Sequence, residues 1–435
     1  MAFLHSHSCE SMKFELELFS LPPTQTTIEQ ANWIHYKPIS SFRDSAPIEF
    51  VVPGSGDEYI DLAHTMLTIR ARILPLTLPV ANASGQMPED TTPGTINNNL
   101  HSMLNQIDVY FNGKLVSPPN DAYAYRAYIE ILLNYSPDTK KSHLTTALWY
   151  DDTAGKMNEI ITDGNKGLAK RKTFTAGGKV FTLLGHLHCD VFNQEKFLLN
   201  GVEVRLRLVR ACDSFSLLGE STSHNLHIWE ASLLVRRAKI SPGILIAHAK
   251  ALSKSTAKYP LTRIEVKAIT MQSAFHGHTI DNVILGQLPK RLIIGFVSNK
   301  VFNGDFGSNP FNFQNYKINY FSLYVDGVHV PSKPLQPDFT QDKLYVDAYH
   351  TLFSGKGIHF LNEGNSITKT DYANGYCLFA FHLIPDLYVN DNGHWNLVKH
   401  GSVRIEVRFE EAPTLLIVLY TLNMIIFLKL TRHVR

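Results

Sequence analysis

The chain has 435 residues, and its 41 Lys and Arg residues nearly balance its 39 Asp and Glu residues. This length exceeds what one ordinary core requires and fits two units of about 200 residues. The balanced charge excludes a global basic field for wrapping nucleic acid, so no sequence-specific nucleic-acid partner is expected. The 4 cysteines form no CxxC pair, which argues against a disulfide framework or a zinc site.

The first 45 residues are predicted to form an extended N-terminal arm. They contain a Leu-Pro-Pro stretch at 21–23 and few periodic apolar positions, and early charged residues argue against a secretory signal. Such arms usually lie on the surface of their own domain or of a neighbour. Residues 46–240 are then expected to form a first β unit, 241–260 a connector, and 261–435 a second β unit.

Two stretches of the chain are similar to one another. In residues 105–116 and 319–330, apolar residues alternate with polar ones, which is the period of a strand with one buried face. An Asn-Gly or Asp-Gly pair follows in each, and such pairs supply the positive φ angles of a type I′ turn. The sequence therefore predicts two structural hairpin turns. Their residues are Asn112, Gly113, Asp326 and Gly327.

A second pair of matched segments follows in the same order. Residues 201–208 and 401–407 each contain a glycine turn and a strand with charged residues on its outer side. Chance recurrence is the alternative, because Asn-Gly hairpins are common in large β proteins. Since both order and register agree, we interpret the two units as a tandem duplication whose loops differ in length.

Residues 123–135 are predicted to form a short helix, because Tyr125, Tyr128 and Leu132 follow helical spacing. The helix should end before Pro137, since the residue preceding a proline disfavours helical backbone. Helices of this kind are too few to cover both faces of a parallel sheet. We therefore expect an all-β fold with short accessory helices and long loops.

The polar stretch 138–180 is predicted to be mainly loop. Its basic cluster at 170–172 is interpreted as a solvated loop, because so short a cluster rarely forms a nucleic-acid site. The adjacent carboxylates Asp151 and Asp152 are interpreted as part of a loop turn. Long irregular loops between short strands favour antiparallel sandwiches, and the eight-stranded jelly roll accommodates them well. Other Greek-key sandwiches fit the same pattern.

Residues 414–428 are almost wholly apolar. The segment is shorter than the roughly 20 residues of a spanning helix, and Asn423 interrupts it. Its β-branched content favours a buried strand. A membrane tail anchor is the alternative, although no membrane partner is predicted from the rest of the chain.

Histidine pairs are the most enzyme-like feature of the sequence. Alternate strand residues face the same way, so His186 and His188, with Asp190, or His276 and His278, could present two imidazoles to one metal. With 20 histidines, such pairs also arise by chance. The sequence contains no G-x-S-x-G, H-E-x-x-H or phosphate-loop motif. No catalytic residue, cofactor or metal ligand is therefore predicted, and the protein is not expected to be an enzyme.

Four segments resemble the major capsid proteins of Polinton (Maverick) elements and the related adintoviruses. They span both predicted units and comprise residues 16–29, 47–64, 107–133 and 309–339. The resemblance implies a double jelly roll, in which two tandem eight-stranded antiparallel β-sandwiches stand side by side. It also implies a homotrimer of pseudo-hexagonal outline that tiles an icosahedral shell. The apolar segment 414–428 departs from the family, whose members end in more polar sequence.

The resemblance further implies a location in the virion capsid and synthesis in the cytoplasm or nucleus of a host cell, without secretion. The expected partners are other copies of the chain and a minor (penton) capsid protein. Two other functions fit the residues. A lectin-like β-sandwich could bind ligands through Tyr-rich and Asn-rich loops, and a jelly-roll metal-dependent oxygenase could use His186 and His188 as ligands.

Overall fold

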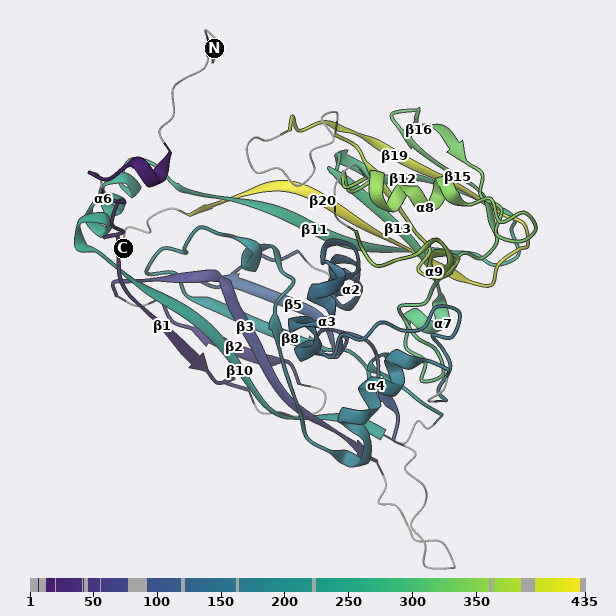
Figure 1. Cartoon of the computed structure of the whole chain (residues 1–435), viewed down its shortest axis with the longest axis horizontal. Coiled ribbons are helices and arrows are strands. Elements are labelled where there is room, and N and C mark those ends of the chain that lie inside the picture. Colours follow the sequence, from purple (N-terminus) through teal and green to yellow (C-terminus); the bar gives the residue numbers. More distant parts are fainter. Residues whose placement is uncertain are drawn as a thin grey trace, which may run out of the picture.

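A computed structural model places the strands of the chain in two similar halves (Figure 1). The structure describes residues 7, 13–19, 21–40, 42, 46–54, 56–76, 92–118, 122–161, 164–220, 224–359, 362, 364–384 and 396–430.

The first half, within these residues, is a sandwich of two antiparallel sheets with four strands each. One sheet has the spatial order β1 (Ile28–Tyr36), β10 (His224–Ile240), β3 (Glu58–Pro75) and β7 (Phe181–His186). The other has the order β2 (Ile48–Val52), β8 (Val204–Arg210), β5 (Leu104–Phe111) and β6 (Lys114–Leu115).

The second half repeats this order strand for strand. Its first sheet contains β11 (Ala257–Met271), β20 (Leu416–Leu430), β13 (Arg291–Ser298) and β18 (Leu378–His382). Its second sheet contains β12 (Gly277–Gln287), β19 (His400–Phe409), β15 (Ile318–Val325) and β16 (Val328–Leu335). Each half is thus an eight-stranded jelly roll in the described part of the chain, which confirms the predicted fold class.

Short elements connect the main strands. Two small sheets pair β4 (Gly94–Thr95) with β9 (Leu217–Leu218) and β14 (Phe313–Gln314) with β17 (Asn374–Gly375). The helices of the first half are η1 (Phe14–Leu16), α1 (Asn99–Ser102), α2 (Tyr123–Asn134), α3 (Pro137–Lys141), η2 (His143–Ala147), α4 (Lys166–Thr175), η3 (Ala176–Gly178), η4 (Asp190–Asn193) and α5 (Asp213–Ser216). Those that follow are α6 (Pro242–Leu252), α7 (Asn299–Phe302), α8 (Val346–Ser354) and α9 (Lys369–Ala373).

The apolar segment 414–428 forms most of β20, as the strand interpretation predicted. β20 lies between β11 and β13 and forms antiparallel pairs with both. Residues 416–422 are buried, which explains why the sequence is apolar at consecutive positions rather than at alternate ones. Among the described residues, no helix combines the length and apolar character needed to cross a bilayer.

Two expected boundaries differ from the structure. Residues 28–36 fall within the predicted arm but form β1, which pairs with β10 at an edge of its sheet. Most of β1 is exposed, so its sequence lacks the apolar alternation that identifies a half-buried strand. The predicted connector 241–260 consists largely of α6 and also contains the first residues of β11.

Each of the two large hydrophobic clusters contains residues from both halves. Tyr125 and Tyr128 of α2 belong to the same buried cluster as Phe311 and Phe313 of the second half. Conversely, Tyr259 and Leu261 of β11 belong to the cluster that fills the first jelly roll. Helix α2, which matches the predicted helix 123–135, therefore lies between the jelly rolls (Figure 1).

Candidate functional site

The most distinctive site is the contact between helices of the first jelly roll and loops of the second, which we call the inter-roll junction. It combines two buried ion pairs with an aromatic stack. Its principal residues are Arg126, Tyr128, Lys140, Asp152, Arg171, Asp190, Asn309 and Phe311.

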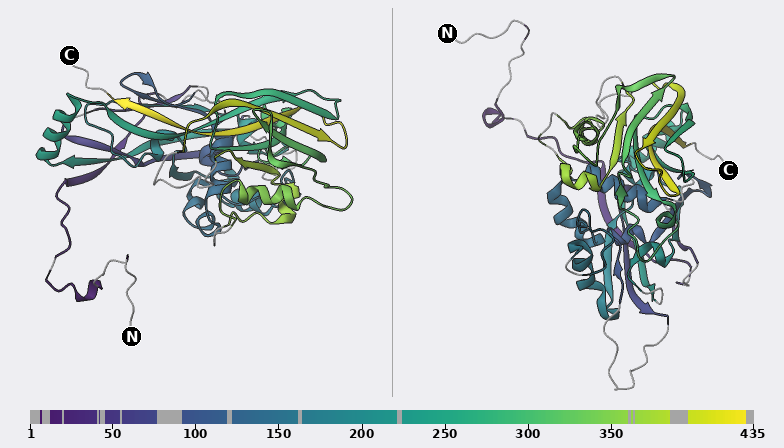
Figure 2. Two further views of the ribbon diagram at one scale, coloured as in Figure 1. Left: turned by 90° about the horizontal axis from the view of Figure 1, so that it is seen from above. Right: turned by 90° about the vertical axis from the view of Figure 1, so that its right-hand side faces the viewer.

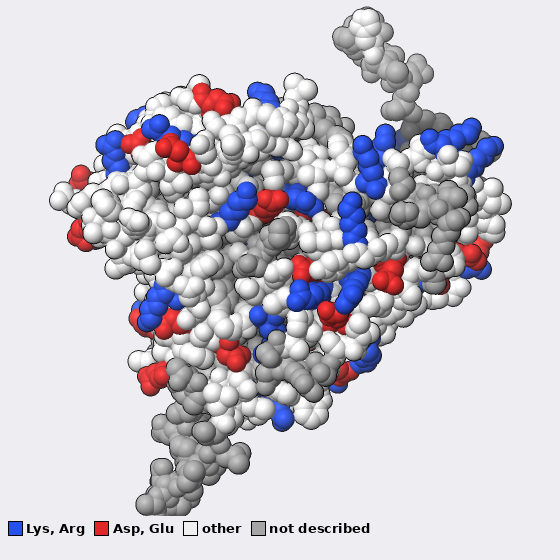
Figure 3. Space-filling model, turned by 180° about the vertical axis from the view of Figure 1, so that it is seen from behind, with Lys and Arg blue, Asp and Glu red and all other residues white. Residues whose placement is uncertain are grey.

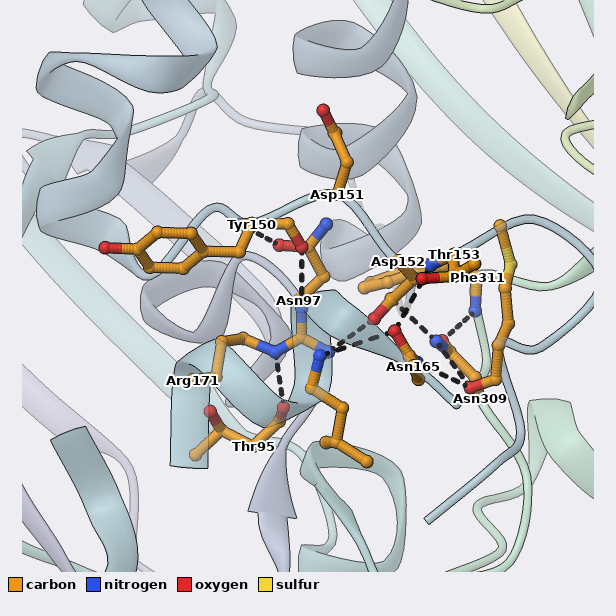
Figure 4. A network of polar contacts seen from close by, with 12 residues as sticks. Thr95, Asn97, Tyr150, Asp151, Asp152, Thr153, Asn165, Arg171, Asn309 and Phe311 are labelled. Carbon is orange, nitrogen blue, oxygen red and sulfur yellow. Dashed lines mark hydrogen bonds and ion pairs between the residues drawn. The ribbon is translucent and has the colours of Figure 1, made fainter. Parts of the chain in front are cut away.

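Arg171 is at the centre of a buried polar network (Figure 4). Its Nη2 lies 2.6 Å from Asp152 Oδ1, and the two side chains are 0% and 1% exposed. Its Nε donates to the Thr95 carbonyl at 2.7 Å, and Nη1 donates to the Tyr150 carbonyl at 2.6 Å. All three nitrogens of the guanidinium group thus have acceptors, which compensates for the loss of water around a buried charge.

The second jelly roll completes this network. Asn309 Nδ2 donates to the other oxygen of Asp152 at 2.8 Å, and the Tyr376 hydroxyl donates to the Asp152 carbonyl at 2.8 Å. The orientation of the Asn309 amide is set by Phe311, whose backbone N–H donates to Asn309 Oδ1 at 3.0 Å. Asp152 therefore joins a cation from the first half to polar groups from the second.

The structure corrects the interpretation of residues 170–172 as a solvated loop. They lie in α4, whose N-cap Asn165 accepts a hydrogen bond from the Leu168 N–H through its side chain. Lys170 and Lys172 are not buried, whereas the intervening Arg171 is fully buried. The Asp151-Asp152 pair is likewise more than a turn, because Asp152 is the partner of Arg171. Asn165, a residue type that commonly caps helices, is a local signal for this helix.

A second ion pair lies where α2 meets β11. Arg126 Nη2 donates to Asp190 Oδ1 at 2.7 Å, and both side chains are 3% exposed. Arg126 Nη1 also donates to the Ile264 carbonyl at 3.1 Å, and Arg263 Nε donates to Asp190 Oδ2 at 3.3 Å. Burial opposes the charge of Arg126, but Asp190 and Glu130 outweigh it and raise the pKa of this guanidinium.

Aromatic packing and a buried lysine extend the junction. The rings of Tyr128 and Phe311 stack with their centroids 4.0 Å apart and an angle of 8° between their planes. Lys140 Nζ donates to the Leu132 carbonyl in α2 at 2.7 Å and to the Asn365 carbonyl in the second half at 3.1 Å. Burial lowers the pKa of Lys140 to about 8. The junction thus holds the two jelly rolls at a fixed orientation through directional contacts.

The first histidine pair lies beside this junction. His188 Nδ1 is 3.4 Å from Glu130 Oε1, and the His188 ring lies 4.8 Å from His101 and 6.3 Å from His186, centroid to centroid. Asp190, the third residue of the candidate metal motif, instead binds Arg126. Within the described part of the chain, no group of three or more His, Cys, Asp or Glu could hold a metal ion.

The buried groups around His188 have shifted pKa values. Burial, then His188 and His186, lower the pKa of His101 well below its usual value. Burial alone would raise the pKa of Glu130, but His188 and Arg126 outweigh it and lower the pKa to about 2. The cluster therefore favours a neutral His101 and an ionised Glu130, both of which lie next to His188.

The second histidine pair lies apart from the first, on β12 and the turn before it. The His276 carbonyl accepts a hydrogen bond from the Phe409 N–H at 2.7 Å, and the His278 ring packs edge-on to Phe409 at 6.4 Å. Through these contacts, His276 and His278 help to hold β12 against β19.

The four hairpin residues have closely matched geometry in the two halves. In the turn between β5 and β6, the φ angles of Asn112 and Gly113 are 48° and 78°. In the turn between β15 and β16, the φ angles of Asp326 and Gly327 are 49° and 83°. Asn112 Oδ1 accepts from the Glu203 N–H at 2.8 Å, and Asp326 Oδ1 accepts from the Ser402 N–H at 2.8 Å. Each turn thus binds the strand that the sequence matched between the two units.

Comparison with known proteins gives one sequence relative and several similar folds. No protein-family model matches the chain. An uncharacterized protein of Caenorhabditis elegans is 26% identical over 401 residues, which cover 90% of this chain and 92% of that protein.

Three solved structures resemble the chain over nearly their whole length. A structure of the Sputnik virophage matches with a TM-score of 0.64 and 12% identity, covering 98% of this chain and 94% of that chain. The Faustovirus major capsid protein matches with a TM-score of 0.53 and 10% identity, covering 95% and 92%. The mavirus major capsid protein matches with a TM-score of 0.52 and 11% identity, covering 99% and 96%. The chain therefore has the double jelly-roll fold of these viral capsid proteins.

Proposed function

We propose that this protein is a structural, non-enzymatic major capsid protein that self-associates into the shell of an icosahedral virion. The observation that carries the proposal is the agreement of the whole double jelly roll with major capsid proteins such as that of mavirus, with only small parts of either chain left uncovered. Fold similarity alone does not fix a function, because one fold can serve several functions. The inter-roll junction supplies a second argument.

The junction makes the two jelly rolls suitable as one rigid subunit of a shell. Buried ion pairs contribute little net stability, but they penalise arrangements in which a charge is left unpaired. Arg171 with Asp152, and Arg126 with Asp190, therefore favour one orientation of the two rolls over others. A shell subunit needs such a fixed shape, since small errors in orientation would accumulate over many copies.

The proposed assembly is a homotrimer with a pseudo-hexagonal outline. Each subunit contributes two similar sandwiches, so three subunits related by a threefold axis present six similar units around a ring. We expect large, partly apolar contacts within a trimer and smaller, more polar contacts between trimers. On the face seen in Figure 3, basic and acidic side chains are interspersed, as suits polar contacts between trimers.

We further propose a Polinton or adintovirus type of capsid, with a minor (penton) protein as partner. The resembling segments support this, since 107–133 contains most of β5, all of β6 and nearly all of α2, and 309–339 contains β14 to β16. The proposed location is the virion capsid, after synthesis in the cytoplasm or nucleus of a host cell, without secretion.

Light scattering of the purified chain, followed by negative-stain imaging, tests the proposal. The mass of one chain is 49.0 kDa, so a trimer should give three times that value, about 147 kDa. The expected particle has a hexagonal outline and assembles into shells as concentration rises. A stable monomer under all assembly conditions would overturn the proposal and would favour a monomeric binding module.

A further inference from the structure

An apolar groove lies at the end of the first jelly roll, beneath helix α6. Its volume is about 660 Å³, and it is formed by α6, by the beginnings of β1 and β11, and by the loop that follows η4. Apolar and aromatic side chains dominate its lining, including Ile28, Tyr59, Phe197, Ile244, Leu252 and Tyr259.

The groove is the open side of an incomplete core. Tyr59, Ala238 and Ile240 form a small buried cluster there. The apolar side chains packed around it are only partly buried, namely Ile28, Phe197, Leu199, Ile244 and Leu245. Helix α6 itself has no buried residue, although its sequence is mostly apolar, and Ile246 is 70% exposed. Exposed apolar surface of this kind indicates a binding partner.

The walls of the groove are fixed by hydrogen bonds. The Tyr59 hydroxyl lies 2.9 Å from His248 Nδ1, which ties α6 to β3. The Tyr259 hydroxyl donates to the Phe197 carbonyl at 3.1 Å and accepts from the Leu199 N–H at 3.2 Å. The groove is therefore preformed, and a ligand would not have to open it.

The N-terminal arm contains a segment with matching properties. Its apolar side chains are strongly exposed, with Leu16 at 65%, Leu18 at 75% and Phe19 at 101%. Leu16 and Leu18 alternate with the carboxylates of Glu15 and Glu17, and Phe19 follows Leu18 directly. In an extended conformation, the leucines would lie on one face and the carboxylates on the other.

We propose that residues 15–19 of one copy dock in the α6 groove of a neighbouring copy. This inference rests on the proposed function, because a shell places copies of the chain side by side. In Figure 2, the arm runs away from its own sandwich, as an arm that reaches a neighbour would. The docked apolar side chains would complete the open core of the recipient.

Charge complementarity favours this occupant. Lys196 and Lys258 line the groove beside Glu195, and the exposed Lys250 and Lys254 lie on and just after α6. The groove region is therefore mainly basic, whereas the docking segment carries two carboxylates. An acidic, apolar segment thus meets a basic, apolar groove, which favours the correct partner over unrelated apolar peptides.

Cysteine crosslinking distinguishes a neighbouring copy from the same copy. The variant carries Leu18→Cys and Leu252→Cys in a Cys9→Ser, Cys212→Ser background and is treated with a short bis-maleimide under assembly conditions. Docking between copies predicts a crosslinked band at twice 49.0 kDa, about 98 kDa, and higher multiples. The control pairs Leu18→Cys with Val328→Cys, an exposed position on the β15–β16 hairpin, and should lose the band.

A charge exchange tests the chemistry of the contact. Glu15→Lys with Glu17→Lys, or Lys196→Glu with Lys258→Glu, should each lose the crosslinked band. Combining all four changes should restore it. Since the reversed pairs lie on the surface, the individual variants should remain folded, which circular dichroism checks.

The outcomes separate this inference from the proposed function. Trimers or shells that form without the band between copies would overturn the docking proposal and leave the capsid function standing. A crosslinked monomer would show that the arm folds back on its own groove and would also overturn it. A chain that remains monomeric and uncrosslinked would overturn both.

Discussion

Arg171 and Asp152 form an ion pair that is almost fully removed from solvent, with Nη2 and Oδ1 2.6 Å apart. Arg171 and Asp152 are 19 residues apart in sequence. The second carboxylate oxygen of Asp152 accepts a hydrogen bond from Asn309, which lies 157 residues further along the chain. One carboxylate therefore joins α4 of the first jelly roll to a loop of the second.

Arg171→Met is expected to destabilise the chain by about 3–5 kcal/mol, because it leaves Asp152 buried without its cation. Denaturant unfolding followed by fluorescence measures the change. The matched control is Lys156→Met, which breaks an exposed pair with Glu159 at 3.8 Å and should cost about 1 kcal/mol or less. Equal effects of the two variants would contradict a structural role of the buried pair.

Acidification is expected to destabilise the first jelly roll. The pKa of His101 is lowered below its usual 6.5, so the unfolded chain takes up a proton more readily, and stability falls as the pH drops below 6.5. The pKa of Glu130 is lowered from 4.5 to about 2, so its contribution is complete above pH 4.5 and is lost between pH 4.5 and 2. Both groups act in the same direction.

His101→Gln separates these two contributions. The variant should flatten the loss of stability between pH 7 and 5 by up to about 1.4 kcal/mol per pH unit, the value for one proton. Thermal unfolding at a series of pH values measures it. His143→Gln, at an exposed position, serves as the control. A slope that both variants leave unchanged would rule out His101 as the source of the acid sensitivity.

Gly327→Val is expected to disrupt the β15–β16 hairpin. Gly327 has a φ of 83°, which a β-branched residue adopts only with strain of about 1–3 kcal/mol. We expect a lower thermal midpoint and a lower yield of the proposed trimer on gel filtration. Gly364→Val is a matched control, because an added side chain there meets open space and φ is outside the left-handed region. Unchanged trimer yield for Gly327→Val would argue against a role of this turn in assembly.

Leu419→Asp should abolish soluble expression, because it places an unpaired charge in the central strand β20, where Leu419 is 1% exposed. The control, Leu415→Asp, lies just before the strand at a position that is 39% exposed, and should remain soluble. The measurement is the amount of each variant that remains in the supernatant after lysis and centrifugation. A soluble, folded Leu419→Asp chain would be incompatible with a buried β20.

The sequence by itself determined the repeated β units, the two hairpin turns and the helix at 123–135. These features depend on local rules: alternation sets the buried face of a strand, and an Asn-Gly or Asp-Gly pair supplies positive φ angles. The matching hydrogen bonds of Asn112 and Asp326 arise from the same local pattern, repeated 214 positions later.

Only the tertiary structure decided which charged residues are buried and where chain segments meet. Arg171 lies between two lysines in a polar stretch, and nothing local distinguishes it from them. Its burial depends on Asp152 and Asn309, which approach it only after both jelly rolls have formed. The strand β1 and the α6 groove likewise depend on distant partners, because pairing with β10 and packing against β11 are contacts that sequence periodicity does not encode.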